Sequence, residues 1–171
     1  MITLILPCEK YLLSYKEAND ESRQNHETRY GFTDPECCDI FEKFDAYRHE
    51  RDLKPGRVGA DYYWLVDDQR NYFIGEICIR HKLTEELLRY GGHIGYGIRH
   101  AEWNKGYGTL MLQLALKKAA ALGISRVLIT CDDDNFASAR VVEKNGLILQ
   151  DKIRHTIAGK DVITRRYIKE L

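Results

Sequence analysis

Neither sign of charge dominates this sequence. Its 171 residues include 26 Lys and Arg and 26 Asp and Glu, and no basic tail stands out. Proteins that bind nucleic acid concentrate positive charge on one face or in one segment. We therefore expect no nucleic acid partner.

Long hydrophobic runs are also missing. No apolar run approaches the roughly 20 residues that a membrane-spanning helix needs. The first ten residues, MITLILPCEK, lack a basic start, and their apolar stretch is short for a signal peptide. We therefore expect no membrane association and a cytoplasmic location.

Cysteine is present in an odd number and without a CxxC pair, at positions 8, 37, 38, 78 and 131. This pattern argues against a disulfide framework and against a structural zinc site, so we expect no bound metal. Cys78 and Cys131 lie in apolar, strand-like runs. We expect both to be small core residues.

Linkers, repeats and low-complexity segments are absent, which favours a single domain over residues 1–171. Apolar spacing and turn residues predict helices over 9–25, 35–51, 83–92, 109–123 and 135–146. They predict strands over 2–7, 60–68, 71–81, 93–99, 125–130, 147–156 and 161–170, the last two joined by AGK. This order indicates an α/β or α+β protein whose helices cover a central sheet.

The segment WNKGYGT places two glycines at the start of the predicted helix over 109–123. A helix N-terminus carries unpaired N–H groups and a partial positive charge. Gly106 and Gly108 let that backbone approach a phosphate closely, and Lys105 adds positive charge. An ordinary strand–turn–helix junction is the alternative interpretation.

This segment resembles the coenzyme A loop of the GNAT superfamily of N-acetyltransferases, written Q/R-x-x-G-x-G/A, which joins the fourth strand to the third helix. Trp103 occupies the Q/R position. WNKGYGT is most similar to the WGKGYAT variant of the ribosomal-protein N-terminal acetyltransferase branch.

A second segment, DNFASARVVEKNG, is similar to the N-x-x-A-x-x-x-Y-x-K-x-G segment of the same superfamily. Asn135, Lys144 and Gly146 match, Ser138 replaces the alanine, and Val142 occupies the tyrosine position. The resemblance is strong over residues 61–147 and weaker outside them.

The resemblance implies the acyl-CoA N-acyltransferase fold, with a central mixed, mostly antiparallel sheet flanked by helices. It implies an acyltransferase that moves an acetyl group from acetyl-CoA to a primary amine on a small molecule or a protein, and it is compatible with a homodimer. The cofactor-binding positions that it implies are Gly97, Ile98, Arg99, Asn104, Lys105, Gly106, Tyr107, Gly108, Thr109, Asn135, Ser138 and Lys144.

Proton transfer is not assigned by the resemblance. In many relatives the tyrosine at the position of Val142 protonates the leaving thiolate, so Tyr96 or a water remains as a donor. For the base, His93 begins the glycine-containing strand HIGYGIR, and its ordinary pKa suits the task. Glu76 is a carboxylate within the apolar run FIGEICI, where burial would raise its pKa. His93 and Glu76 are the candidate catalytic residues. A structural role is the alternative for each, and His81 is interpreted as a strand-end residue.

The acceptor is not identified by the sequence. The N-terminal helices of the superfamily shape this site, and here they contain Tyr11, Tyr15, Glu17, Asp20, Tyr30 and Tyr47. Asp132–Asp134 would attract a cationic amine, or simply form a solvated loop. A non-catalytic acyl-CoA-binding or sensing domain is the main alternative function. A nucleotide-binding module is a weaker one, because neither GxGxxG nor GxxxxGK[ST] is present.

Overall fold

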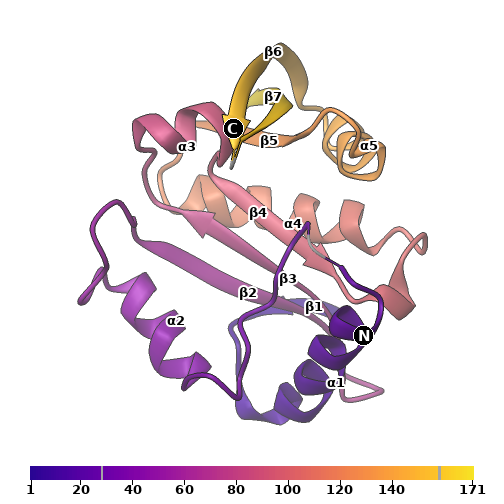
Figure 1. Cartoon of the computed structure of the whole chain (residues 1–171). Helices are drawn as coiled ribbons and strands as arrows, with labels where there is room; N and C mark the ends of the chain where they lie inside the picture. Colours follow the sequence, from indigo (N-terminus) through magenta and orange to yellow (C-terminus); the bar gives the residue numbers. More distant parts are fainter. Residues whose placement is uncertain (28, 158) are drawn as a thin grey trace.

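The computed structural model describes residues 1–27, 29–157 and 159–171. Two antiparallel sheets form its centre (Figure 1). The first sheet has the order β1-β2-β3-β4, from strands Ile2–Ile5, Ala60–Asp67, Tyr72–Arg80 and Ile94–Ile98. The second has the order β5-β7-β6, from strands Arg126–Asp132, Lys160–Glu170 and Ile148–Ile157.

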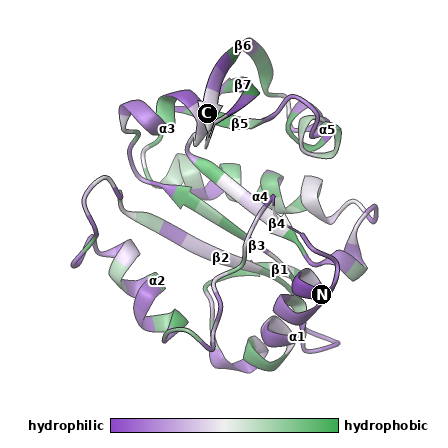
Figure 2. Cartoon of the chain, in the orientation of Figure 1, coloured by the Kyte–Doolittle hydropathy of each residue, from purple (hydrophilic) through white to green (hydrophobic). Residues whose placement is uncertain are grey.

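The helices cover both faces of the first sheet. Strand residues alternate between faces, so Tyr63 and Leu65 join the hydrophobic cluster under α4 (Tyr107–Ala121). Trp64 and Val66 join the opposite cluster with α1 (Leu12–Gln24) and α2 (Ile40–Arg48). Figure 2 shows hydrophobic residues along β3, between the two helix layers, and hydrophilic residues on the helix surfaces. The predicted α+β class with helices flanking antiparallel sheets is confirmed.

The second sheet carries α5 (Phe136–Lys144) near its β5 edge, and α3 (Glu85–Tyr90) packs against β5 and β7. Short 3-10 turns at Glu9–Tyr11 and His100–Glu102 complete the order of elements. Cys78 and Cys131 are buried, as predicted, and all five cysteines are free. None of the helices described has the length and hydrophobicity required to span a membrane.

Two boundaries differ from the sequence prediction. The helix predicted from Pro35 begins at Ile40, because the Asp39 side chain accepts hydrogen bonds from the N–H groups of Phe41 and Glu42 at 2.9 and 3.1 Å. The helix after the glycine loop begins at Tyr107 and is the fourth α-helix, since α3 precedes β4. Ala158, in the predicted AGK turn, lies outside the described residues.

Candidate functional site

β4 and β5 touch at one end and then diverge. The His93 N–H donates to the Leu128 carbonyl at 2.7 Å, and the Leu128 N–H donates to Nδ1 of His93 at 3.0 Å. Beyond this pair β4 has no strand partner on its β5 side within the described residues. Polar main-chain groups along that edge are therefore available to a ligand, apart from the Ile98 carbonyl, which accepts a hydrogen bond from Trp103.

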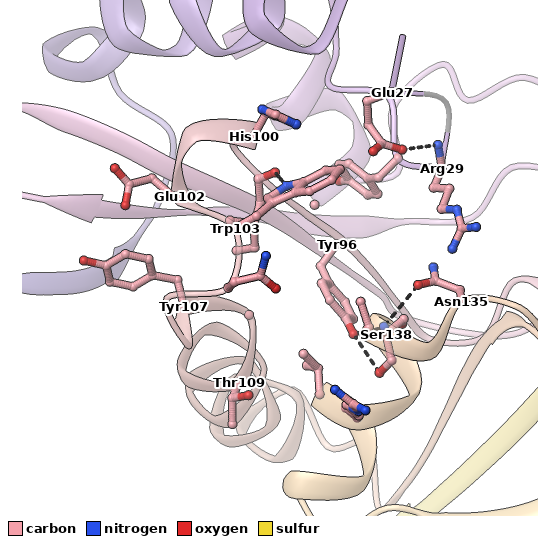
Figure 3. A pocket seen from close by; sticks show the side chains of 18 of the residues that line it. Glu27, Arg29, Tyr96, His100, Glu102, Trp103, Tyr107, Thr109, Asn135 and Ser138 are labelled. Carbon is pink, nitrogen blue, oxygen red and sulfur yellow. Dashed lines mark hydrogen bonds between the residues drawn. The ribbon is translucent and has the colours of Figure 1, made fainter. Parts of the chain in front are cut away.

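A groove of about 850 Å³ lies beside β4 (Figure 3). Its walls are β4, the loop before α4, the start of α5 and the segment after α1. The lining includes ten of the twelve predicted cofactor positions, namely Gly97, Ile98, Asn104, Gly106, Tyr107, Gly108, Thr109, Asn135, Ser138 and Lys144. Segments distant in the sequence thus meet at one cavity.

The start of α4 has the geometry of an anion site. Gly106 is its N-cap, with a φ of +85° that favours glycine, and no side chain of the described residues caps the helix. Main-chain N–H groups of the first turn have no partner within a helix. They face the groove together with the positive end of the helix dipole, an arrangement that suits a phosphate.

Gly108, in the first turn of α4, lies against α5. A Cβ at that position would lie 3.2 Å from Cγ2 of Val141 on α5. A side chain there would press on α5 or narrow the groove. The glycine thus permits the close approach of α4 and α5.

Arg99 and Lys105, the two other predicted positions, do not line the groove. Arg99 is 5% exposed, and its Nε donates to Glu21 at 2.8 Å while the guanidinium also contacts Ser14. Lys105 pairs with the buried Glu102 at 3.1 Å. Both cations are held by carboxylates and lie outside the groove lining, and a role for either in cofactor binding stays a prediction.

Asn135 and Ser138 shape the opposite wall. The Asn135 side chain accepts the Ser138 N–H at 3.1 Å and so caps α5. The Tyr96 hydroxyl lies 3.0 Å from Oγ of Ser138, across the groove floor (Figure 3). Burial raises the pKa of Tyr96, so its hydroxyl keeps its proton at neutral and mildly alkaline pH.

The comparisons with known proteins agree with this geometry. The model of the acetyltransferase (GNAT) domain matches residues 13–148. The chain belongs to the GNAT acetyltransferase family. The enzyme class expected from the sequence, an acyltransferase, is thereby confirmed. A search of curated proteins gave no significant match.

Solved structures share the fold at low identity. The ribosomal L7/L12 α-N-protein acetyltransferase RimL, in complex with coenzyme A, has a TM-score of 0.72 at 17% identity, over 99% of this chain and 94% of that one. The microcin C7 self-immunity acetyltransferase MccE, in complex with acetyl-CoA and AMP, has 0.73 at 17%, over 99% and 92%. The ribosomal-protein-S5-alanine acetyltransferase of Vibrio fischeri has 0.73 at 15%, over 99% and 92%.

The GNAT tyrosine position offers no hydroxyl here. Val142 is fully buried in the core cluster, and its neighbour Val141 lines the groove instead. The side chains with hydroxyl groups that line the groove are Ser22, Tyr30, Tyr96, Tyr107, Thr109 and Ser138, and the Tyr30 hydroxyl is already bonded to Glu76. A proton donor to a leaving thiolate would come from this set or from water.

Of the two candidate bases, His93 does not line the groove. It lies where β4 and β5 meet, and its Nδ1 accepts the Leu128 N–H. Burial, followed by the nearby Arg80, lowers the pKa of His93, which favours the neutral ring. His81, near Asp61 at 3.6 Å, is also outside the groove.

Glu76 is 1% exposed and likewise does not line the groove. Its carboxyl group accepts from Trp64 Nε1 at 3.0 Å and from the Tyr30 hydroxyl at 3.0 Å. Oη of Tyr15 lies 3.1 Å from Oε2 of Glu76 and 3.0 Å from the Thr33 carbonyl.

The single hydroxyl proton of Tyr15 cannot serve both oxygens. If Glu76 carries a proton on Oε2, it donates to Tyr15, and Tyr15 then donates to Thr33, so that every group is satisfied. Burial, the largest cause, raises the pKa of Glu76 in the same direction. Burial therefore favours a neutral Glu76 and outweighs the hydrogen bonds to its carboxyl group, which lower the pKa, whereas a base must be ionised. The roles of Glu76 and His93 as bases remain predictions.

Several groove residues were missed or not singled out by the sequence. Of the acidic and aromatic residues that the sequence analysis named for the acceptor pocket, Tyr30 is the one found in the lining of this groove. Trp103, in the Q/R position, also lines it, and its Nε1 donates to the Ile98 carbonyl at 2.7 Å. No local pattern marks Tyr30, because only the path of the chain brings it to β4.

The Asp132–Asp134 run is engaged with cations of the protein. Asp133 pairs with Arg165 at 2.6 Å and with Lys152 at 2.8 Å. Asp134 lies 3.4 Å from Arg29 of the segment after α1. Over residues 1–27, 29–157 and 159–171, no three His, Cys, Asp or Glu side chains form a group that could hold a metal ion.

Proposed function

We propose that this GNAT protein transfers the acetyl group of acetyl-CoA to a primary amine on a small molecule or a protein. The observation that carries the proposal is the groove that joins the uncapped start of α4 to the free edge of β4. The pyrophosphate of coenzyme A suits the N–H groups of Tyr107, Gly108 and Thr109. The coenzyme complexes of RimL and MccE support this choice of donor.

The arrangement accounts for the steps of acetyl transfer. A free amine has a pKa of roughly 8 to 10, so its proton must be removed before attack. Attack on the thioester produces an oxyanion, which main-chain N–H groups along the free edge of β4 would stabilise. Tyr96, which lines the groove, would then protonate the leaving thiolate, since position 142 is a valine.

The acceptor has two candidate classes. The likeness of WNKGYGT to the ribosomal-protein branch, and the fold shared with RimL, favour the N-terminal amine of a protein. MccE, a self-immunity acetyltransferase bound to acetyl-CoA and AMP, supports a small-molecule amine. Thiol release with a panel of small amines and of peptides with free N-termini distinguishes the two.

Ligand-dependent melting tests the donor. Acetyl-CoA should raise the melting temperature increasingly as its concentration exceeds its dissociation constant, whereas NAD and ATP should not. Equal shifts with ATP, or none with any coenzyme A compound, would contradict the proposal.

A non-catalytic acyl-CoA-binding domain is the second candidate, favoured by the buried Val142. It would replace the first if acetyl-CoA binds but no amine of the panel is acetylated.

A further inference from the structure

One end of the groove is defined by the fold. The start of α4 suits phosphates, and β4 runs from Ile98, beside that loop, back to the junction of His93 and Leu128. A ligand whose phosphates lie at α4 therefore extends its arm along β4 toward Gly97 and Tyr96. If the proposed function holds, the acyl group of the donor lies where Gly97 and Tyr30 line the groove.

Tyr30 forms the wall at that point. A Cβ at Gly97 would lie 2.5 Å from Cδ1 and 2.9 Å from Cγ of Tyr30, so the ring lies directly on the glycine backbone. The same ring would lie 3.6 Å from a Cβ at Gly95. Tyr30 thus fills the space that two successive glycines leave on one face of β4.

The ring is held in this position by Glu76. Glu76 and Gly97 are partners in the β3–β4 ladder, so the Glu76 side chain and the bare face of Gly97 point the same way. The Tyr30 hydroxyl donates to Oε1 of Glu76, whose other contacts are with Trp64 and Tyr15. Phe32 packs edge-on against Tyr30 at 5.7 Å between ring centres. Movement of the ring would break a buried hydrogen bond.

We propose that Tyr30, anchored by the buried Glu76, limits the length of the acyl group that the donor site accepts. Tyr30 and Gly97 line the groove side by side, so each methylene added to an acetyl group must press on a fixed ring over a backbone that cannot yield. Glu76 acts through Tyr30 and is a positioning residue in this role.

Binding of coenzyme A, acetyl-CoA and butyryl-CoA by the full chain tests the proposal without an acceptor. The unmodified protein should bind butyryl-CoA on the order of tenfold more weakly than acetyl-CoA, as expected for a pocket that discriminates by methylene groups. Tyr30→Ala should reduce the ratio to about threefold or less, with a similar change in Tyr30→Leu. Tyr30→Phe keeps the ring and should keep most of the discrimination.

Tyr90→Ala is the matched control, since it removes a partly exposed tyrosine ring from α3, outside the groove. Its ratio should equal that of the unmodified protein. Equal binding of the two thioesters by the unmodified protein, or an unchanged ratio in folded Tyr30→Ala and Tyr30→Leu, would overturn the proposal. An equal loss for all three ligands in both variants would overturn it too, because Tyr30 would then hold the groove as a whole. Failure of the unmodified protein to bind any of the three would instead overturn the proposed function, and this inference with it.

Discussion

At the residue scale, we propose Tyr96 as the proton donor to the leaving thiolate, since its hydroxyl lies beside Ser138 in the groove. Tyr96→Phe keeps the ring and removes the hydroxyl that contacts Ser138. Turnover should fall on the order of 100-fold, the usual size of a general acid contribution, while acetyl-CoA affinity stays nearly constant. Steady-state kinetics with an accepted amine, beside a binding titration, measures both. Unchanged turnover would assign protonation to water.

Glu76 gives the second prediction at this scale. Because burial raises the pKa of Glu76 and so favours a neutral carboxyl group, Glu76→Gln should keep turnover within about tenfold and leave the acidic limb of the pH–rate profile in place. Glu76→Ala also removes the hydrogen bond that holds Tyr30. It should lower both the preference for acetyl-CoA over butyryl-CoA and the stability of the fold. A loss of 100-fold or more in Glu76→Gln, together with the acidic limb, would instead establish Glu76 as the base. His93→Gln tests the other candidate in the same assay.

At the element scale, one glycine flanks each end of α4. Both have a positive φ, but only the first lines the groove. Gly106 (φ +85°) precedes the helix and Gly123 (φ +81°) follows it, and a Cβ at either would meet no atom within 4 Å. Alanine at each should therefore destabilise the fold by a similar amount, about 1 kcal/mol, through backbone strain.

The two variants should differ in ligand binding. Gly106 lines the groove and orients the first turn, so Gly106→Ala should weaken coenzyme A binding, whereas Gly123→Ala should not. Thermal unfolding and a binding titration separate the two effects. Equal affinities in folded variants would show that the turn at Gly106 does not hold the phosphates.

At the scale of the whole molecule, the two sheets meet through the pair of His93 and Leu128. The folded state favours the neutral ring, because burial lowers the pKa of His93 and because Nδ1 accepts the Leu128 N–H. In the unfolded chain the ring takes a proton below about pH 6.5. The unfolded state then binds more protons, so this group makes stability fall as the pH decreases through that value.

His93→Gln should therefore flatten the change in the urea midpoint between pH 7 and pH 5. Its amide oxygen can still accept the Leu128 N–H, so the junction is retained. The raised pKa of Glu76 acts with the opposite sign but is common to both proteins, and it cancels in the comparison. His49→Gln, at an exposed histidine, is the control. If the urea midpoint of His93→Gln changes between pH 7 and pH 5 as much as that of the unmodified protein, His93 does not contribute to the acid sensitivity.

What the sequence determined by itself was local. Alternating and helical apolar spacing, together with residues such as Thr84 and Asn135 at helix starts, placed nearly every strand and helix. Gly106 and Gly108 at a predicted helix start indicated a turn that can bind phosphate, and the resemblance of this segment and of the Asn135 segment to the GNAT superfamily implied coenzyme A.

Only the tertiary structure decided where side chains point. Arg99 and Lys105 belong to the segment predicted to bind the cofactor, yet both pair with nearby carboxylates and do not line the groove. Tyr30 and Glu76 are 46 residues apart and meet because β3 pairs with β4 while the segment after α1 crosses that ladder. Such contacts depend on packing between distant parts of the chain, which local spacing does not encode.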